Sequence, residues 1–129
     1  MAQTIPRDKT RESVALAAFF KIAEQWELNT QQQMKLLGMT SESTFHKYKN
    51  APEGAKIDPD KLERLSLVLG IYKDLRTLLS NEESARTWIK KPNSAEPFCG
   101  RAALDYMTET GRMLDLYRVR HYLAAQRGV

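Results

Sequence analysis

The sequence predicts an all-α fold. Apolar residues recur at spacings of three and four over successive segments, which is the period of helices with one buried face. Residue types that cap helices, namely Thr, Ser, Asn and Asp, precede these segments. No alternating apolar and polar stretch is long enough to argue for a sheet. The 129 residues suffice for one compact domain or two small ones.

Composition excludes several classes of protein. There is no run of about 18 apolar residues, so no membrane span is expected. The N-terminus lacks the apolar core of a signal peptide, and the single Cys99 rules out an internal disulfide, so a cytoplasmic location is expected. With only His46 and His121, no histidine metal site is expected. No nucleophile–base set and no phosphate loop is present, so we expect neither an enzyme nor a cofactor.

The first helix is expected to begin between Thr10 and Ser13 and to end near Glu27. Residues 1–12 form an arm before it. The arm is either a disordered terminus or a basic segment that contacts a phosphate backbone through Arg7, Lys9 and Arg11. The buried face of the helix is predicted to consist of Leu16, Phe19, Phe20, Ala23 and Trp26.

Two short helices joined by a tight turn are predicted next. Asn29 or Thr30 begins the first, and Gly38 ends it, because the residue after a helix often takes a left-handed conformation that glycine adopts without strain. Thr40 or Ser41 begins the second, over residues 41–49. The inward side chains are predicted to be Met34, Leu37, Phe45 and Tyr48.

This pair of helices is interpreted as a helix-turn-helix, in which the second helix lies in the DNA major groove. A purely structural helical hairpin with a glycine turn is the alternative. A single exposed histidine such as His46 is more often a surface residue than a ligand. The DNA-binding candidates are the polar side chains of the second helix and its cap: Ser41, Ser43, Thr44, His46, Lys47 and Lys49.

Three more helices are expected over the middle of the chain. The first begins at Asp58-Pro59, with Asp as N-cap and Pro at the first helical position, and stops near Gly70. The second covers residues 71–79. The third begins at Ser80 or Asn81. The apolar residues predicted to pack are Leu62, Leu65 and Leu69, then Ile71, Leu75, Leu78 and Leu79, then Ala85, Trp88 and Ile89.

The C-terminal part begins with an irregular loop. Two prolines and a glycine exclude regular structure over residues 90–101, where Phe98 is expected in the core and Cys99 has no activating partner. The final helix is expected to begin near Thr108 or Thr110. Its inward ridge is predicted to be Leu116, Val119 and Leu123.

The arginines of this helix leave two interpretations open. Arg120 and Arg127 are seven residues apart and therefore share one face, while Asp115, Arg118 and Tyr122 form a neighbouring set. These faces are either solvated or dock onto a partner, since Arg and Tyr are enriched at interface hot spots.

The net charge of +4 is mildly basic and unevenly distributed. Residues 1–70 hold 10 basic and 9 acidic side chains, whereas residues 71–129 hold 10 and 7. The excess therefore lies in the C-terminal part. DNA binding by the N-terminal half would depend on a local basic face rather than on a global field.

Two C-terminal segments carry a resemblance to a known family. They read PFCGRAALDYM over residues 97–107 and DLYRVRHYLAAQRG over residues 115–128. They resemble the toxin-binding domain of the Xre/MbcA/ParS antitoxin family, closest to the antitoxins paired with RES-domain toxins. The resemblance includes Leu36-Leu37-Gly38 and Ser43-Thr44-Phe45 and covers residues 15–128. Two departures are Ala103, where many relatives have proline, and the chain end at Val129.

The resemblance implies an antitoxin that blocks the active site of an NAD+-depleting RES toxin and represses its own operon. The implied partners are that toxin, operator DNA and a second copy of the chain, with larger toxin–antitoxin complexes. Residues 13–75 would be the helix-turn-helix and dimerisation region, and residues 76–129 a small helical toxin-binding domain. The alternative is a stand-alone helix-turn-helix regulator with a C-terminal interaction or dimerisation domain. The implied toxin-binding residues are Gly100, Arg101, Tyr117, Arg120, Tyr122, Arg127 and Gly128.

Overall fold

The computed structural model describes residues 10–128, and these residues form helices and loops without a β-strand. The predicted all-α fold is confirmed. Most of the expected arm lies outside the described residues, and Arg11 already belongs to the first helix. In chain order the elements are α1 (Arg11–Gln25), α2 (Thr30–Leu37), α3 (Glu42–Asn50), η1 (Pro52–Gly54), α4 (Pro59–Leu78), α5 (Glu82–Thr87), η2 (Trp88–Lys90), α6 (Ala103–Thr108) and α7 (Met113–Gln126).

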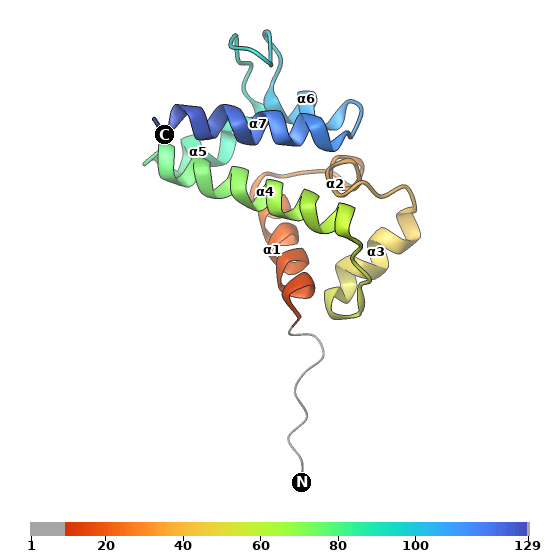
Figure 1. Cartoon of the computed structure of the whole chain (residues 1–129). Coiled ribbons are helices and arrows are strands. Elements are labelled where there is room, and N and C mark those ends of the chain that lie inside the picture. The colour runs from red at the N-terminus through yellow and green to blue at the C-terminus, as the bar shows by residue number, and fades with distance from the viewer. Residues whose placement is uncertain (1–9, 129) are drawn as a thin grey trace.

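The 20-residue helix α4 lies at the centre of the molecule. Helix α1 crosses it on one side, and α7 runs along it on the other (Figure 1). These two packings are the most extensive contacts between elements. The buried apolar side chains of all seven α-helices and η2 form one continuous core. The N-terminal and C-terminal parts of the chain therefore share both a helix and a core.

Local capping fixes where five of the helices begin. In each case the side chain before the helix accepts a hydrogen bond from the backbone N–H three residues later, which satisfies one of the free donors of the first turn. At Asp58 the hydrogen bond from the Lys61 backbone N–H is the main cause that lowers the carboxyl pKa. The five caps are Thr10, Asn29, Ser41, Asp58 and Asn81, which agree with the residues expected from the sequence.

The predicted helix stop at Gly70 is wrong, because α4 continues through it to Leu78. The buried face of the helix runs on from Val68 to Ile71, so packing holds the backbone helical across the glycine. Gly70 serves a different purpose. A Cβ added there would lie 2.2 Å from Nε of Arg120, so the missing side chain lets Arg120 pass close over α4.

The final helix begins later than predicted. Thr108 is the last residue of α6, and α7 starts at Met113. Gly111 lies between them with φ of 72°, a left-handed conformation that interrupts the helix and favours glycine. The hydroxyl of Thr110 donates to the buried carboxylate of Asp115 (3.0 Å), which ties the turn to the first turn of α7.

The segment between η2 and α6 is irregular, as predicted, and projects from the body of the molecule (Figure 1). Its base is closed by an isolated bridge between Pro92 and Ala102. Phe98 is fully buried, which confirms the prediction that it lies in the core. Its ring meets Tyr122 and Tyr106 edge to face, with centroids 5.1 and 5.7 Å apart, and these contacts anchor the loop on α6 and α7.

Candidate functional site

The turn between α2 and α3 has the geometry expected of a helix-turn-helix. Gly38 ends α2 with φ of 69°, and the N–H groups of Gly38 and Met39 donate to carbonyls in the last turns of α2. Ser41 begins α3, and its hydroxyl accepts the backbone N–H of Thr44 (3.2 Å). The buried side chains of the two helices and the turn all belong to the common core: Met34, Leu37, Met39 and Phe45.

One outward face of α3 gathers three of the predicted DNA-binding residues. Ser43, His46 and Lys47 are exposed, and their spacing places Ser43 and Lys47 opposite the fully buried Phe45, with His46 between them and Phe45. The imidazole of His46 lies 3.6 Å from the carboxylate of Glu42. The sequence interpretation missed Asn50, which is exposed and lies on the same face at the seventh position after Ser43.

The remaining three predicted residues lie elsewhere. Ser41 and Thr44 are joined by the cap of α3, so they lie at the end of the helix that points its free N–H groups outward. Lys49 is exposed but lies about 200° around the helix from Lys47, because each residue turns the helix by about 100°.

A hollow of about 160 Å³ lies at the N-terminal end of α3, and one of the side chains that line it is a cation from α4. Lys61 lines it, and its ammonium group lies 3.1 Å from the carboxylate of Asp58. No pattern within the helix-turn-helix could have indicated Lys61, because it comes from the first turn of another helix. The hollow is lined by Gly38, Met39, Thr40, Ser41, Thr44 and Lys61.

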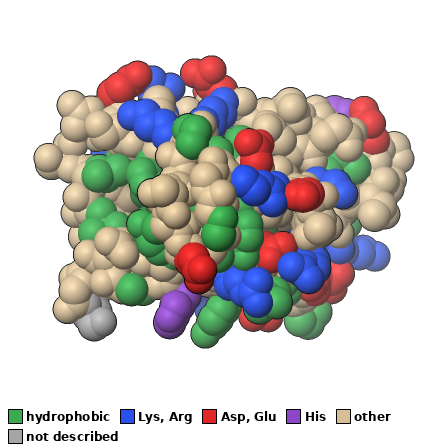
Figure 2. All heavy atoms as spheres, turned by 90° about the horizontal axis from the view of Figure 1, so that it is seen from above, with side chains coloured by type: hydrophobic (Ala, Val, Ile, Leu, Met, Phe, Trp, Pro, Cys, Tyr) green, Lys and Arg blue, Asp and Glu red, His purple; other side chains and the backbone are tan. Residues whose placement is uncertain are grey.

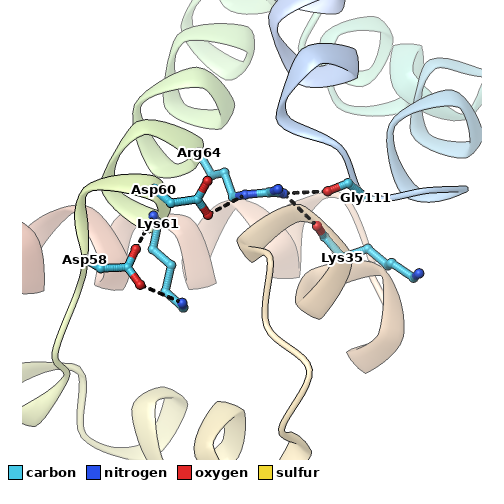
Figure 3. A network of polar contacts seen from close by, with 6 residues as sticks. All are labelled: Lys35, Asp58, Asp60, Lys61, Arg64 and Gly111. Atoms are coloured by element: carbon cyan, nitrogen blue, oxygen red, sulfur yellow. Dashed lines mark hydrogen bonds and ion pairs between the residues drawn. The ribbon is translucent and has the colours of Figure 1, made fainter.

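Arg64 of α4 connects the helix-turn-helix with the start of α7 (Figure 3). Its Nη1 donates to the carbonyl of Lys35 (3.3 Å), in the last turn of α2, and to the carbonyl of Gly111 (2.8 Å), in the turn before α7. Its Nε donates to the carboxylate of Asp60 (3.0 Å). The guanidinium is almost fully buried, and a Cβ on Gly38 would lie 2.7 Å from its Nε. We call these contacts the Arg64 junction.

An apolar groove of about 580 Å³ lies along α7 beside the projecting loop. Tyr117 and Leu114 are 56% and 48% exposed, although large hydrophobic side chains normally lie inside. Figure 2 looks down on this end of the molecule, where hydrophobic side chains lie among basic and acidic ones. The groove is lined by Glu96, Pro97, Leu114, Tyr117, Arg118, His121, Tyr122 and Ala125.

Two of the seven residues proposed for toxin binding line this groove. Tyr117 is exposed, whereas Tyr122 is half-buried because its ring stacks on Trp88 and meets Phe98 edge to face. Gly100 and Gly128 are exposed, and a Cβ added at either would meet no atom within 4 Å.

Arg101 is also exposed, but it contacts neighbouring residues of the chain. Its guanidinium donates to the backbone carbonyl of Asp105 (3.1 Å) and lies 2.7 Å from the carboxylate of Glu109. Arg101 therefore connects the base of the loop to Asp105 of α6 and to Glu109, the residue after α6.

Arg120 and Arg127 both bind the carboxylate of Asp74 on α4. Arg120 donates to Oδ2 at 3.1 Å and Arg127 to Oδ1 at 2.7 Å. Asp74 is only 1% exposed, so the two guanidinium groups compensate a carboxylate that is removed from water. The shared face that the sequence predicted for the two arginines therefore packs against α4, with their side chains 35% and 39% exposed.

The sequence interpretation missed most of the groove, although one signal was available. Leu114 and Tyr117 are three residues apart and lie on the side of α7 away from the buried Leu116 and Val119. Apolar residues on the outward face of an otherwise amphipathic helix indicate a binding surface. Pro97 and Glu96 come from the projecting loop, and only the folded chain brings them beside α7.

Neither a metal site nor a membrane helix is found within residues 10–128. No three His, Cys, Asp or Glu side chains there are grouped so as to hold a metal ion. No helix of this region has the length and apolar character needed to cross a membrane.

Comparison with known proteins gives matches over nearly the whole chain. Residues 6–70 match the family described as the antitoxin Xre-like helix-turn-helix domain. Residues 74–128 match the family described as the antitoxin Xre/MbcA/ParS C-terminal toxin-binding domain. A protein of Sinorhizobium fredii (strain NBRC 101917 / NGR234), described as uncharacterized protein y4oB, is 49% identical over 121 residues. Those residues are 94% of this chain and 90% of that protein.

Proposed function

Because the chain belongs to the Xre-type antitoxins, with a helix-turn-helix domain followed by a toxin-binding domain, we propose that it neutralises a RES-domain toxin and represses its own operon. The toxin would deplete NAD+, and the antitoxin would block the way to its active site. The observation that carries the proposal is the exposed apolar groove on α7, which lies within the residues matched by the toxin-binding family. That family match favours this function over a stand-alone regulator.

The groove has the character of an interface centre. Tyr117 and Leu114 offer apolar area that water solvates poorly, and tyrosine is enriched at binding hot spots. Arg118 and His121 add polar groups beside them. We propose Gly100, Arg101 and Gly128 as contacts around this centre, and Tyr122 as a wall of the groove.

Arg120 and Arg127 have a supporting role in this proposal. Both hold α7 against α4 through Asp74, so they position the groove. Their exposed portions leave room for a toxin contact at the edge of the interface. The basic balance of residues 71–129 suits an acidic toxin surface or a site that binds a phosphate-rich ligand such as NAD+.

Expression of the neighbouring gene tests the pairing. Alone, its product is expected to arrest growth and to lower cellular NAD+. Co-expression with this chain should restore growth, and the two proteins should copurify. Growth arrest without loss of NAD+ would contradict the RES assignment. Failure to copurify would contradict the pairing itself.

Two variants separate toxin contact from support of α7. Tyr117→Ala should weaken toxin binding by about tenfold or more and leave the melting temperature near that of the wild type, because the side chain is exposed. Arg120→Ala should lower the melting temperature, because it removes a partner of the buried Asp74. Lys73→Ala, an exposed substitution on α4, is the control and should change neither quantity. Unchanged toxin binding by Tyr117→Ala would exclude the groove as the interface centre.

For operator binding we propose α3 as the reading helix. Ser43, His46, Lys47 and Asn50 form its outward face, and the N–H groups at its N-terminal end suit a phosphate. Lys61 would add a phosphate contact from α4. Ser41 and Thr44 would act at that same end, and Lys49 on the flank. A single reading helix offers few contacts, so a homodimer would supply the remaining affinity.

For that homodimer we propose a face made by α1 and η1. It carries a hollow of about 430 Å³ with Val14, Ala17 and Ala18 along α1, and Val14 is 56% exposed. Lys21 and Glu53 line the same hollow with opposite charges, and neither forms an ion pair with another described residue. In a two-fold dimer each surface meets itself, so Lys21 of one copy would face Glu53 of the other.

A charge exchange tests this face. Lys21→Glu should shift the protein towards monomer, because two acidic groups would then meet across the axis. Glu53→Lys in the same chain should restore the dimer. Sedimentation at several concentrations measures both. A dimer that is equally stable in Lys21→Glu would exclude this face.

A further inference from the structure

We propose that the pocket between α2 and the turn before α7 holds a phosphate group of the operator backbone. The DNA interface would then extend from the helix-turn-helix into the region that matches the toxin-binding family, because Thr110 and Gly111 form one side of this pocket. The inference rests on the proposed function, since it requires that α3 bring the chain to DNA. No residue of α3 itself lines the pocket.

The pocket lies beside the Arg64 junction and has the charge of an anion site. Its volume is about 390 Å³. Two of its lining residues are cationic, Lys35 of α2 and Arg64 of α4, and none is acidic. The side chain of Arg64 is only 11% exposed, so one of the two positive charges lies in a wall that is largely shielded from water.

Lys35 is the cation that is free to bind a phosphate. Its aliphatic stem packs against Gly111, since a Cβ added there would lie 3.1 Å from Cδ of Lys35. The side chain then extends away from the Arg64 guanidinium (Figure 3). Lys35 is exposed and forms no ion pair with another residue of the described range 10–128. Lys61, beside the N-terminal end of α3, is in contrast already paired with Asp58.

Neutral donors stand beside this cation. Thr40 is exposed, and neither its hydroxyl nor its backbone N–H has a partner in the described part of the chain. The same holds for the side-chain amide of Gln31 and for the backbone N–H of Gly111. Phosphate oxygens accept hydrogen bonds from groups of these kinds in protein–DNA complexes. The hydroxyl of Thr110 is already used, because it donates to Asp115.

The position of the pocket favours the DNA backbone over a free anion. The pocket shares Gly38, Met39 and Thr40 with the hollow at the N-terminal end of α3, so the two lie next to each other at the turn. In helix-turn-helix complexes the first helix crosses the DNA backbone while the second lies in the major groove. Gln31 and Lys35 are four residues apart on α2 and therefore share the face that would cross the backbone.

The experiment measures affinity for the duplex upstream of this gene at several salt concentrations. Lys35→Met keeps the stem over Gly111 and removes the charge. It should weaken binding by about threefold or more and lower the slope of log K against log salt concentration by about 0.9, the value of one phosphate contact. Thr40→Val should weaken binding by about twofold or more. Both variants should melt near the wild-type temperature, because both side chains are exposed.

Lys73→Met is the matched control, because it removes an exposed lysine nine residues further along α4 than Arg64. It should change neither the affinity nor the salt slope. Lys35→Met should also weaken binding to an unrelated duplex by the same factor as binding to the operator, since phosphate contacts carry no sequence information. A loss confined to the operator would show that Lys35 reads bases and would overturn the inference.

Single neutral methylphosphonate linkages in the operator locate the phosphate. One linkage should weaken binding of the wild type and have no effect on Lys35→Met, because the two changes remove the same contact. In nuclear magnetic resonance spectra, operator DNA should also shift the amide resonance of Gly111. The amide of Gly128, which donates to the carbonyl of Ala125 at the far end of α7, should not move. An unmoved Gly111 amide would overturn the extension of the interface to this turn.

The outcomes separate this inference from the proposed function. If Lys35→Met binds the operator as the wild type does, while Lys47→Ala binds it more weakly, the inference is overturned and operator binding through α3 stands. If inorganic phosphate alone shifts the Gly111 amide and Lys35→Met still binds the operator normally, the pocket takes a free anion and the DNA source is overturned. A wild type that does not bind the duplex overturns the proposed repression, and the inference with it.

Discussion

Two glycines with opposite backbone requirements shape the middle of the chain. Gly38 takes a left-handed conformation to end α2, as its sequence context indicates. Gly70 lies within α4, where glycine is normally unfavourable compared with alanine. Its presence there is explained by Arg120, whose guanidinium crosses directly over the Gly70 backbone on the way to Asp74.

The effect of Gly70→Ala on the free energy of unfolding is therefore expected to have opposite signs with and without the Arg120 side chain. In the wild type the added methyl group should displace Arg120 and destabilise the fold by about 1 kcal/mol, since overpacking outweighs the gain in helix propensity. In an Arg120→Ala background the same change should stabilise by about 1 kcal/mol. Urea unfolding of the four proteins measures both values.

Gly54→Ala is the matched control for this cycle. A Cβ at Gly54 would meet no atom within 4 Å, so its effect should be the same in both backgrounds. If Gly70→Ala stabilises the wild type as it does the Arg120→Ala protein, the close passage of Arg120 is not what excludes a side chain.

At the scale of elements, α3 and α7 each present different chemistry on different faces. The buried side of α3 is anchored by Phe45 and its outward side is polar. Helix α7 has three functions around its circumference. Leu116, Val119 and Leu123 fill the core, Arg120 and Arg127 bind α4, and Leu114 and Tyr117 face solvent in the groove. The exposed fraction of a residue on α7 therefore does not by itself tell whether the residue packs against α4 or faces solvent in the groove.

The faces of α3 predict unequal roles for its two lysines. Lys47→Ala should weaken operator binding, because Lys47 lies on the outward face. It should also reduce by about one the number of counterions released on binding, which is read from the slope of log K against log salt concentration. Lys49→Ala should have a smaller effect on both quantities. Titrations of each variant at several salt concentrations measure them. Equal effects of the two substitutions would contradict the outward face defined by Ser43, His46, Lys47 and Asn50.

At the scale of the whole molecule, the two regions matched by separate families are not separate in space. Helix α4 runs through the end of the first match at residue 70 and the start of the second at residue 74. One core contains buried side chains from both. The proposed boundary between residues 75 and 76 falls within α4. It therefore separates two proposed binding regions but not two separately folded domains.

A shared core predicts one cooperative unfolding transition. Trp26 lies in the N-terminal part and Trp88 in the C-terminal part, so Trp88→Phe and Trp26→Phe leave one reporter in each. Trp26→Phe breaks no hydrogen bond among the described residues, because the buried indole N–H has no partner there, and the smaller ring should lower the midpoint of both signals together. Within each variant, fluorescence and circular dichroism should give the same urea midpoint. A fluorescence midpoint that departs from the circular dichroism midpoint in either variant would show that the parts unfold independently.

The amino-acid sequence by itself indicated an all-helical chain, the cap at Asp58, the turn at Gly38 and the burial of Phe98, and it narrowed two further caps to Asn29 or Thr30 and to Thr40 or Ser41. These features depend on apolar spacing and on hydrogen bonds within one turn of the chain, so neighbouring residues are enough to predict them. The family resemblance likewise follows from contiguous segments.

Only the tertiary structure decided what the arginines and Gly70 do. Arg64 reaches Gly111 across 47 residues, and Arg120 and Arg127 reach Asp74 across 46 and 53. A long cationic side chain on a helix surface looks the same in sequence whether it meets solvent, a toxin or a buried carboxylate. The packing of α7 along α4 selects among these partners, because it removes Asp74 from water and leaves the two arginines as its partners.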